Sequence, residues 1–200
     1  MKATFFGDRM KKLLFLISCV VVVILIYIIK SNNKVTYLEI SDKNVIGDKS
    51  VKYLSNKKML EDYIYYKNDN NYRLIDFCND IKNNKEIVFN NKEYTINNLF
   101  IKSKYIVLNI GHNEIDNIYK TELDPIKTLD DFVDIYENII MTIRGITKEN
   151  IIIIFDYDLE EKYRDYLYNK MYLISNKYDC SMILKNELLK YIKDFTNNKK

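Results

Sequence analysis

One short apolar stretch constrains the fold of this chain more than any other part of it. Residues 104–110, with the sequence KYIVLNI, are followed directly by Gly111, His112, Asn113 and Glu114. Such a run is typical of a central strand of a parallel sheet that is buried on both faces. Ligands of open α/β sheets bind at the carboxyl ends of such strands. We therefore expect any functional crevice to lie where this strand ends.

Strand and helix patterns alternate along the chain after residue 34. Apolar runs predict strands, and apolar residues spaced three and four apart predict amphipathic helices. The expected strands are residues 34–40, 60–66, 104–110, 150–156 and 180–184, with a small hairpin at 87–95. The expected helices are residues 50–58, 72–83, 97–102, 129–144 (ended by Gly145), 159–174 and 187–195. This order predicts a three-layer α/β domain with a mostly parallel sheet.

The N-terminal region contains an uninterrupted apolar run, residues 13–29. Its length is close to the minimum of about 17 residues that a helix needs to span a bilayer. More basic residues precede the run than follow it, which places the N-terminus in the cytoplasm. We predict a cytoplasmic N-terminus (1–12), a transmembrane signal anchor (13–29), a linker (30–34) and an α/β domain outside the cell membrane (35–200).

Two other interpretations of this region are open. A cleaved signal peptide would require small residues after the apolar run, and residues 27–34 contain no such site. The sequence LISC, residues 16–19, resembles a lipoprotein cleavage box, but apolar sequence continues for ten residues beyond Cys19. Both features favour an uncleaved single-pass anchor.

Composition argues against several functional classes. His112 is the single histidine, which excludes multi-histidine metal sites. Cys19, Cys78 and Cys180 lack metal-binding spacing, and Cys78 and Cys180 are either paired outside the cell or buried as thiols. The net charge is only +3, and no basic stripe suggests nucleic-acid binding. We expect no metal and no cofactor, and the oligomeric state stays open.

Three blocks together give the chain a family resemblance: residues 37–42 (YLEISD), 71–77 (NYRLIDF) and 106–114 (IVLNIGHNE). With this order of elements, the chain resembles the SGNH (GDSL-type) hydrolases, and within them a membrane-anchored branch from low-GC Gram-positive bacteria. The resemblance covers about residues 35–156. It implies a flavodoxin-like α/β fold, and an esterase or acyl hydrolase that acts on an acyl, ester or glycan ligand.

The sequence departs from this family at most of the catalytic positions. The family begins with Gly-Asp-Ser, whose serine is the nucleophile, whereas this chain has Ser41, Asp42 and Lys43. A Gly-Asp-Lys-Ser sequence at residues 47–50 echoes the motif but lies too far past the strand. The family's Gly-x-Asn-Asp block matches residues 111–114, so the resemblance implies that Asn113 donates to an oxyanion. No histidine follows His112, so the closing Asp-x-x-His is absent. These departures predict a catalytically degenerate member.

Most candidate site residues also have a purely structural interpretation. Ser41 is a candidate nucleophile with Lys43 as its base, or Ser41 and Asp42 cap the following segment. His112 is a candidate base or a crevice-lining residue, and Glu114 is interpreted as a loop charge near Asp116. The crevice is expected to include Gly111 and Glu114, and these residues are joined by Asp156 unless Asp156 belongs to the start of the next helix.

Two functional hypotheses of different classes follow from these residues. The first is a membrane-anchored binding or scaffold module that has lost catalysis. The second is an active ester or acyl hydrolase with a rearranged site, which would need a nucleophile, a base and oxyanion donors. A third alternative is an unrelated single-pass protein whose α/β domain matches by chance.

Overall fold

The computed structural model describes residues 15–22, 35–43, 46–56, 60–67, 72–89, 91–118 and 124–197. The chain divides into two compact units, Met1–Lys34 and Val35–Lys200. Residues 15–22 are helical, and the rest of the predicted anchor (13–29) lies outside the described residues. Within the described ranges, no helix combines the length and the apolar character needed to cross a membrane.

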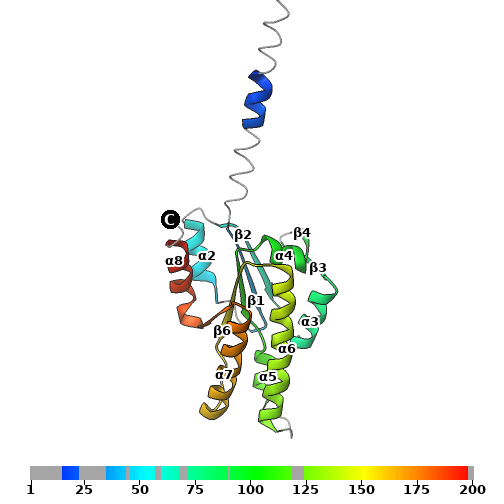
Figure 1. Ribbon diagram of the computed structural model, residues 1–200, viewed down its shortest axis with the longest axis vertical. Helices are drawn as coiled ribbons and strands as arrows, with labels where there is room; N and C mark the ends of the chain where they lie inside the picture. The colour runs from blue at the N-terminus through cyan, green and yellow to red at the C-terminus, as the bar shows by residue number, and fades with distance from the viewer. Residues whose placement is uncertain are drawn as a thin grey trace, which may run out of the picture. The chain divides into compact units, whose positions relative to one another are not determined.

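A parallel sheet forms the middle layer of the second unit (Figure 1). Its strands, in spatial order, are β2 (Leu60–Lys67), β1 (Val35–Ser41), β5 (Tyr105–Asn109), β6 (Asn150–Phe155) and β7 (Ser181–Leu184). Every neighbouring pair in this sheet is parallel. A separate antiparallel hairpin joins β3 (Glu86–Phe89) to β4 (Lys92–Thr95). The predicted α/β class and mostly parallel sheet are confirmed.

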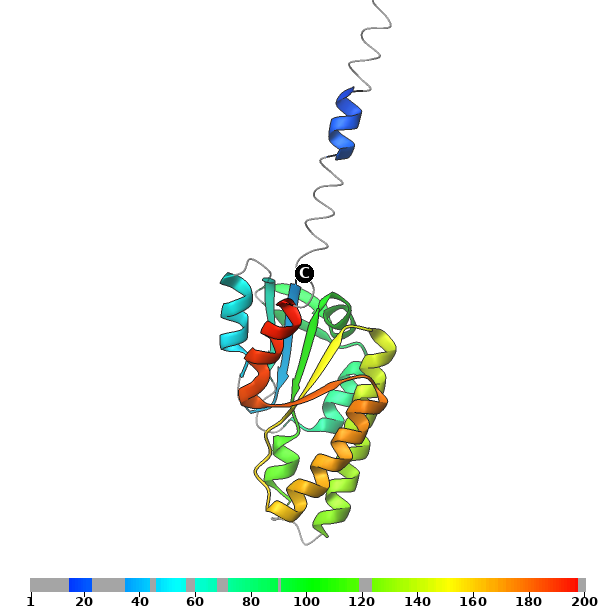
Figure 2. The same ribbon diagram turned by 60° about the vertical axis from the view of Figure 1, so that its left-hand side comes forward.

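Helices cover both faces of the sheet, as Figures 1 and 2 show. One face carries α3 (Leu74–Lys82), α4 (Ile96–Lys102), α6 (Pro125–Ile146) and α7 (Glu161–Lys177). The other face carries α2 (Asp48–Asn56) and α8 (Leu188–Asn197), which follows the short 3-10 helix η1 (Lys185–Glu187). The short helix α5 (His112–Asp116) begins immediately beyond β5.

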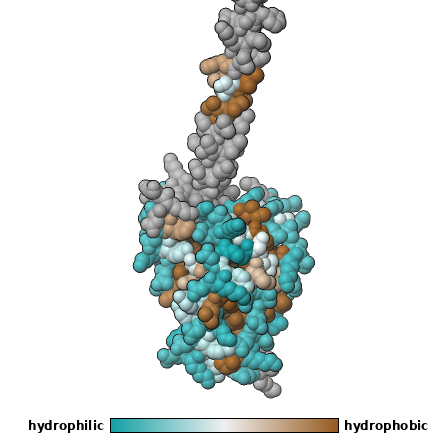
Figure 3. All heavy atoms as spheres, viewed as in Figure 1, coloured by the Kyte–Doolittle hydropathy of each residue, from teal (hydrophilic) through white to brown (hydrophobic). Residues whose placement is uncertain are grey.

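Alternate residues of the strands supply the two apolar cores. In β6, Ile151 and Ile153 pack with the helices of the first face, and Ile152 and Ile154 pack with α2 and α8. This two-sided burial explains why β5 and β6 have nearly continuous apolar sequences. The side of the domain visible in Figure 3 is mainly hydrophilic, with separate apolar patches.

Several details of the predicted elements are wrong. Gly145 does not end its helix: α6 continues to Ile146, and its carboxyl-terminal cap is Thr147. Glu114 and Asp116 are not loop charges, because both lie in α5. This helix was missed because it has only five residues and a polar sequence without amphipathic periodicity. Cys78 and Cys180 are both free thiols, and Cys180 is only partly buried.

The strand order places a topological switch between β1 and β5. The chain leaves β1 toward β2 on one side, and then returns to form β5, β6 and β7 on the other side. Crossover connections diverge at such a point, so a crevice forms at the carboxyl ends of the two strands. The residues that follow β1 and β5, namely 42–43 and 110–113, therefore define the candidate site.

Candidate functional site

The ends of β1 and β5 are held together by hydrogen bonds. Ser41 lies directly opposite Asn109 in the parallel pairing. The Asn109 amide Nδ2 donates to Ser41 Oγ at 3.1 Å, and the Asp42 backbone N–H donates to the Asn109 carbonyl at 3.3 Å. Because both side chains are buried, this polar contact fixes the two strand ends relative to each other.

The Asp42 carboxylate is the most highly connected polar group of the site. Its Oδ2 accepts hydrogen bonds from the backbone N–H groups of Gly111 at 2.7 Å and His112 at 2.9 Å. Its Oδ1 lies 2.7 Å from His112 Nδ1, and both side chains are buried. A carboxylate in this position holds the imidazole ring in one orientation and favours the tautomer with the proton on Nδ1.

His112 also lines a polar hollow. Among the described residues, Nε2 has no hydrogen-bond partner. His112 lines a hollow of about 380 Å³, together with Lys43, Asn109, Asp156, Tyr157, Asp158 and Lys185. Tyr157 packs against the imidazole with 5.2 Å between ring centroids. The arrangement therefore presents a buried, oriented histidine to a polar, partly open space.

Tyr157 supports the ring of His112 and is itself held by a hydrogen bond. Its hydroxyl donates to the Ile110 carbonyl at 2.7 Å. Burial raises the pKa of the Tyr157 phenol well above its ordinary value, so the hydroxyl stays protonated and remains a donor. Tyr157 is thus a positioning residue that links the end of β6 to the end of β5.

Ser41, the candidate nucleophile, lies inside the core. Its residue is 0% exposed, and its hydroxyl accepts the hydrogen bond from Asn109. Lys43, at the position where the family has its serine, extends outward and forms an ion pair with Asp116, with 3.0 Å between Nζ and Oδ2. The structure therefore separates Ser41 from the partner that was considered for it as a base.

Asn113 and Glu114 connect α5 to the start of α3. Asn113 Nδ2 donates to the Tyr72 carbonyl at 2.9 Å, and the Leu74 backbone N–H donates to Glu114 Oε1 at 2.8 Å. In the part of the chain that the structure describes, neither residue lines the hollow at His112. Asn113 therefore lies near the crevice but outside the hollow that His112 lines.

Glu114 contributes a testable pH dependence of stability. Its Oε2 is buried without a hydrogen-bond partner, and burial raises the pKa of its carboxyl above the ordinary value of 4.5. The folded state therefore binds this proton more tightly than the unfolded state. The resulting stability is present below pH 4.5 and is lost as the pH rises through the raised pKa.

We expect Glu114→Gln to remove this component from the pH profile. Relative to the wild type, the variant should gain stability between pH 4.5 and neutrality, as measured by urea unfolding at several pH values. Glu93→Gln, which changes an exposed glutamate of the hairpin, is the matched control. The prediction would be contradicted if the difference in free energy of unfolding between the wild type and Glu114→Gln stayed the same at all pH values.

The structure adds site residues that sequence reasoning missed. Asn109 was recognisable as the one polar residue within an apolar strand, and Tyr157 and Asp158 directly follow the candidate Asp156. Lys185 carried no signal, because the chain brings it to the site from η1, far along the sequence. Its Nζ lies 3.1 Å from Asp156 Oδ2. Asp156 therefore lines the hollow, while the next helix, α7, begins only at Glu161.

The arrangement of possible metal ligands bears on what the site can hold. The described ranges contain no group of three or more histidine, cysteine, aspartate or glutamate side chains that could hold a metal ion. The positive charges at the hollow come from Lys43 and Lys185, each about half exposed and each paired with a carboxylate.

Comparison with known proteins supports the fold. No protein-family model and no curated protein sequence matches the chain. Among solved structures, the chain is similar to the acetyl xylan esterase AlAXEase, with a TM-score of 0.50 and 14% sequence identity. The match covers 82% of this chain and 84% of that one. The domain therefore shares an α/β fold with a mostly parallel sheet with this esterase.

Proposed function

We propose that residues 35–200 form a degenerate SGNH hydrolase-like domain, which binds a ligand in the crevice between β1 and β5 without serine ester chemistry. The observation that carries this proposal is the burial of Ser41, whose residue is 0% exposed and whose hydroxyl accepts from Asn109. An acyl-enzyme mechanism requires a nucleophile that can reach the substrate carbonyl and a base within hydrogen-bond distance of it.

The polar groups of the crevice fit binding better than acyl transfer. Its lining has donors in Lys43, Lys185 and the Asn109 amide, and it has acceptors in Asp156 and Asp158. Among the described residues that line the hollow, there is no serine, threonine or cysteine. A ligand with hydroxyl, ester or carboxylate groups, such as a glycan or an acyl ester, has the chemistry to satisfy these groups.

The proposal predicts that the full chain does not hydrolyse 4-nitrophenyl acetate above the buffer rate. It also predicts no covalent labelling by a fluorophosphonate reagent, because no serine hydroxyl is activated. Ser41→Ala should behave like the wild type in both assays, and far-UV circular dichroism checks that the variant is folded. Turnover that is abolished by Ser41→Ala or by Asn113→Ala would overturn the binding proposal.

The Asp42–His112 pair favours one alternative function. A histidine that is oriented by a carboxylate and lines a polar space can act as a general base on water. In that case the domain would hydrolyse an ester directly, without an acyl-enzyme. Turnover should then survive in Ser41→Ala and fall by about 10²–10⁴-fold in His112→Gln.

We also propose that residues 13–29 anchor the domain to the outer face of the cell membrane. The proposal is supported by the uncharged apolar run and by the excess of basic residues before it. The chain should then stay in the membrane pellet after alkaline carbonate extraction, and added protease should digest the domain on intact spheroplasts. Release of an intact chain by carbonate would refute the anchor.

A further inference from the structure

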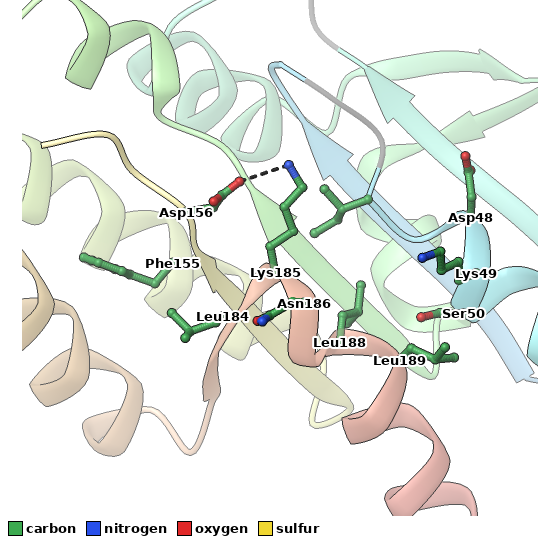
Figure 4. A pocket seen from close by; sticks show the side chains of 11 residues that line it. Asp48, Lys49, Ser50, Phe155, Asp156, Leu184, Lys185, Asn186, Leu188 and Leu189 are labelled. Atoms are coloured by element: carbon green, nitrogen blue, oxygen red, sulfur yellow. Dashed lines mark hydrogen bonds and ion pairs between the residues drawn. The ribbon is translucent and has the colours of Figure 1, made fainter.

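A second, larger pocket lies beside the hollow that His112 lines. It has a volume of about 790 Å³ and opens between the first turn of α2 and the segment that joins β7 to α8 (Figure 4). It shares only Asp156 and Lys185 with the hollow at His112. We propose that this pocket binds a small amphiphilic carboxylate, such as a medium-chain fatty acid.

One side of the pocket is apolar. Its apolar lining residues are Ile46, Phe155, Leu184, Leu188 and Leu189. Leu184 stands out, because 46% of its surface is exposed although it is a large apolar residue at the end of a strand. An alkyl chain seated here would remove this surface from water, which is favourable in proportion to the area covered.

The opposite side offers donors to an anion. It is formed by the first turn of α2, where helix geometry leaves the first backbone N–H groups without intrahelical partners. Figure 4 shows the Lys49 amine and the Ser50 hydroxyl turned toward Leu188, whereas the Asp48 carboxylate extends in another direction. A carboxylate placed at this turn would meet the positive end of the helix dipole.

Ser50 is the independent observation that points to a ligand. Its residue is only 1% exposed, yet its hydroxyl has no hydrogen-bond partner among the described residues and lines the pocket. A bound carboxylate would supply an acceptor for this hydroxyl. Lys49, which makes no ion pair within the described ranges, is the nearest cation on the same helix turn.

The first turn of α2 is fixed before any ligand arrives. Glu39, a fully buried residue of β1, accepts hydrogen bonds from the backbone N–H groups of Ile46 at 2.8 Å and Gly47 at 2.9 Å. The side chain of Tyr37 donates to the same carboxylate at 3.0 Å. These three bonds hold the start of the helix against the sheet, so binding would not have to order it.

The charged residues of the pocket leave Lys49 available. Asp156 and Lys185 neutralise each other through their 3.1 Å ion pair. The remaining charges are Asp48 and Lys49, and Figure 4 shows that only Lys49 extends toward the apolar side. The pocket thus combines an apolar surface with one cation, one hydroxyl and a helix N-terminus, which matches a carboxylate joined to an alkyl chain.

The test is titration of the full chain, held in lipid nanodiscs without detergent, with octanoate, followed by amide chemical shifts in NMR spectra. We expect saturable shifts at residues 46–50 and 184–189, with a dissociation constant of about 1 mM. Lys49→Ala should weaken binding about fivefold, and Ser50→Ala about threefold. Lys52→Ala removes an exposed lysine from the next turn of α2 and should leave the affinity unchanged.

Two further ligands, octanol and oleate-containing vesicles, test whether the carboxylate and the free acid are what the pocket recognises. Octanol, which has the chain without the charge, should bind at least fivefold more weakly than octanoate. Equal binding of octanol, or octanoate binding that is insensitive to Lys49→Ala and Ser50→Ala, would overturn the proposed anion site. Absence of shifts at 10 mM octanoate, or binding to oleate-containing vesicles without binding of free octanoate, would also overturn the proposal. The ester assay is independent of these outcomes, so the two proposals can fail separately.

Discussion

Gly111→Ala should lower the free energy of unfolding by about 3 kcal/mol, from backbone strain and overpacking together. Gly111 has a φ of +97°, a left-handed conformation that residues with a side chain rarely adopt. An added Cβ would also collide with the Phe132 ring, whose Cζ would lie 2.9 Å away, and it would approach Leu74 Cδ1 at 3.3 Å. Urea unfolding followed by circular dichroism measures the effect.

Gly145→Ala is the matched control for this prediction. Gly145 lies in α6, and a Cβ at this position would meet nothing within 4 Å. Since alanine is a better helix former than glycine, this variant should be more stable than the wild type by about 0.5–1 kcal/mol. Similar effects of the two substitutions would show that the conformation at Gly111 does not constrain the site.

Asp42→Ala should destabilise the domain by about 3–5 kcal/mol, because it leaves buried partners of the carboxylate unsatisfied. Those partners are the backbone N–H groups of Gly111 and His112 and the imidazole Nδ1. Asp42→Asn should lie between the wild type and Asp42→Ala, because its amide oxygen can still accept from the backbone. Urea unfolding measures the free energy of unfolding of each variant, and the comparison requires that its slope against urea concentration is the same for all of them.

Asp116→Ala is the control for Asp42→Ala, because it removes a carboxylate that is not buried. Its ion pair with Lys43 is about half exposed, so its loss should change stability by less than about 1 kcal/mol. If Asp42→Ala were as mild as Asp116→Ala, the carboxylate could not be the group that joins the ends of β1 and β5. His112 would then have no firmly held orientation, and the proposal of a general base would lose its support.

The sequence allowed the fold class to be predicted because burial on both faces of the sheet leaves a clear pattern. The runs around Val107 and Ile152 have almost no polar residue, and the apolar stripe from Leu129 to Ile143 is long enough to establish a helix. Short elements lack this redundancy. The five residues of α5 present only His112 and Ile115 to the interior, too few to display a helical period.

The candidate site was less predictable, because its geometry depends on contacts between distant segments. Asp42 and His112 were each recognised, but nothing in the sequence indicates that the carboxylate bonds to Nδ1 of that histidine. Likewise, Asn113 matched a motif, yet the direction of its amide depends on the position of Tyr72. The larger pocket combines residues from three segments, and the sequence pattern indicates its Ser50 only as part of a displaced echo of a catalytic motif.

The order of strands in the sheet has a consequence for how the chain acquires its structure during synthesis. β1 is made early, but its central neighbour, β5, follows only after β2, the hairpin and three helices have emerged. The bond between Asp42 and the His112 N–H closes a loop of 70 residues. Such distant pairings form slowly, because the entropy of loop closure is lost before the contacts form. Until β5 leaves the ribosome, one edge of β1 has no partner, and this interval is when the nascent domain is most exposed to aggregation.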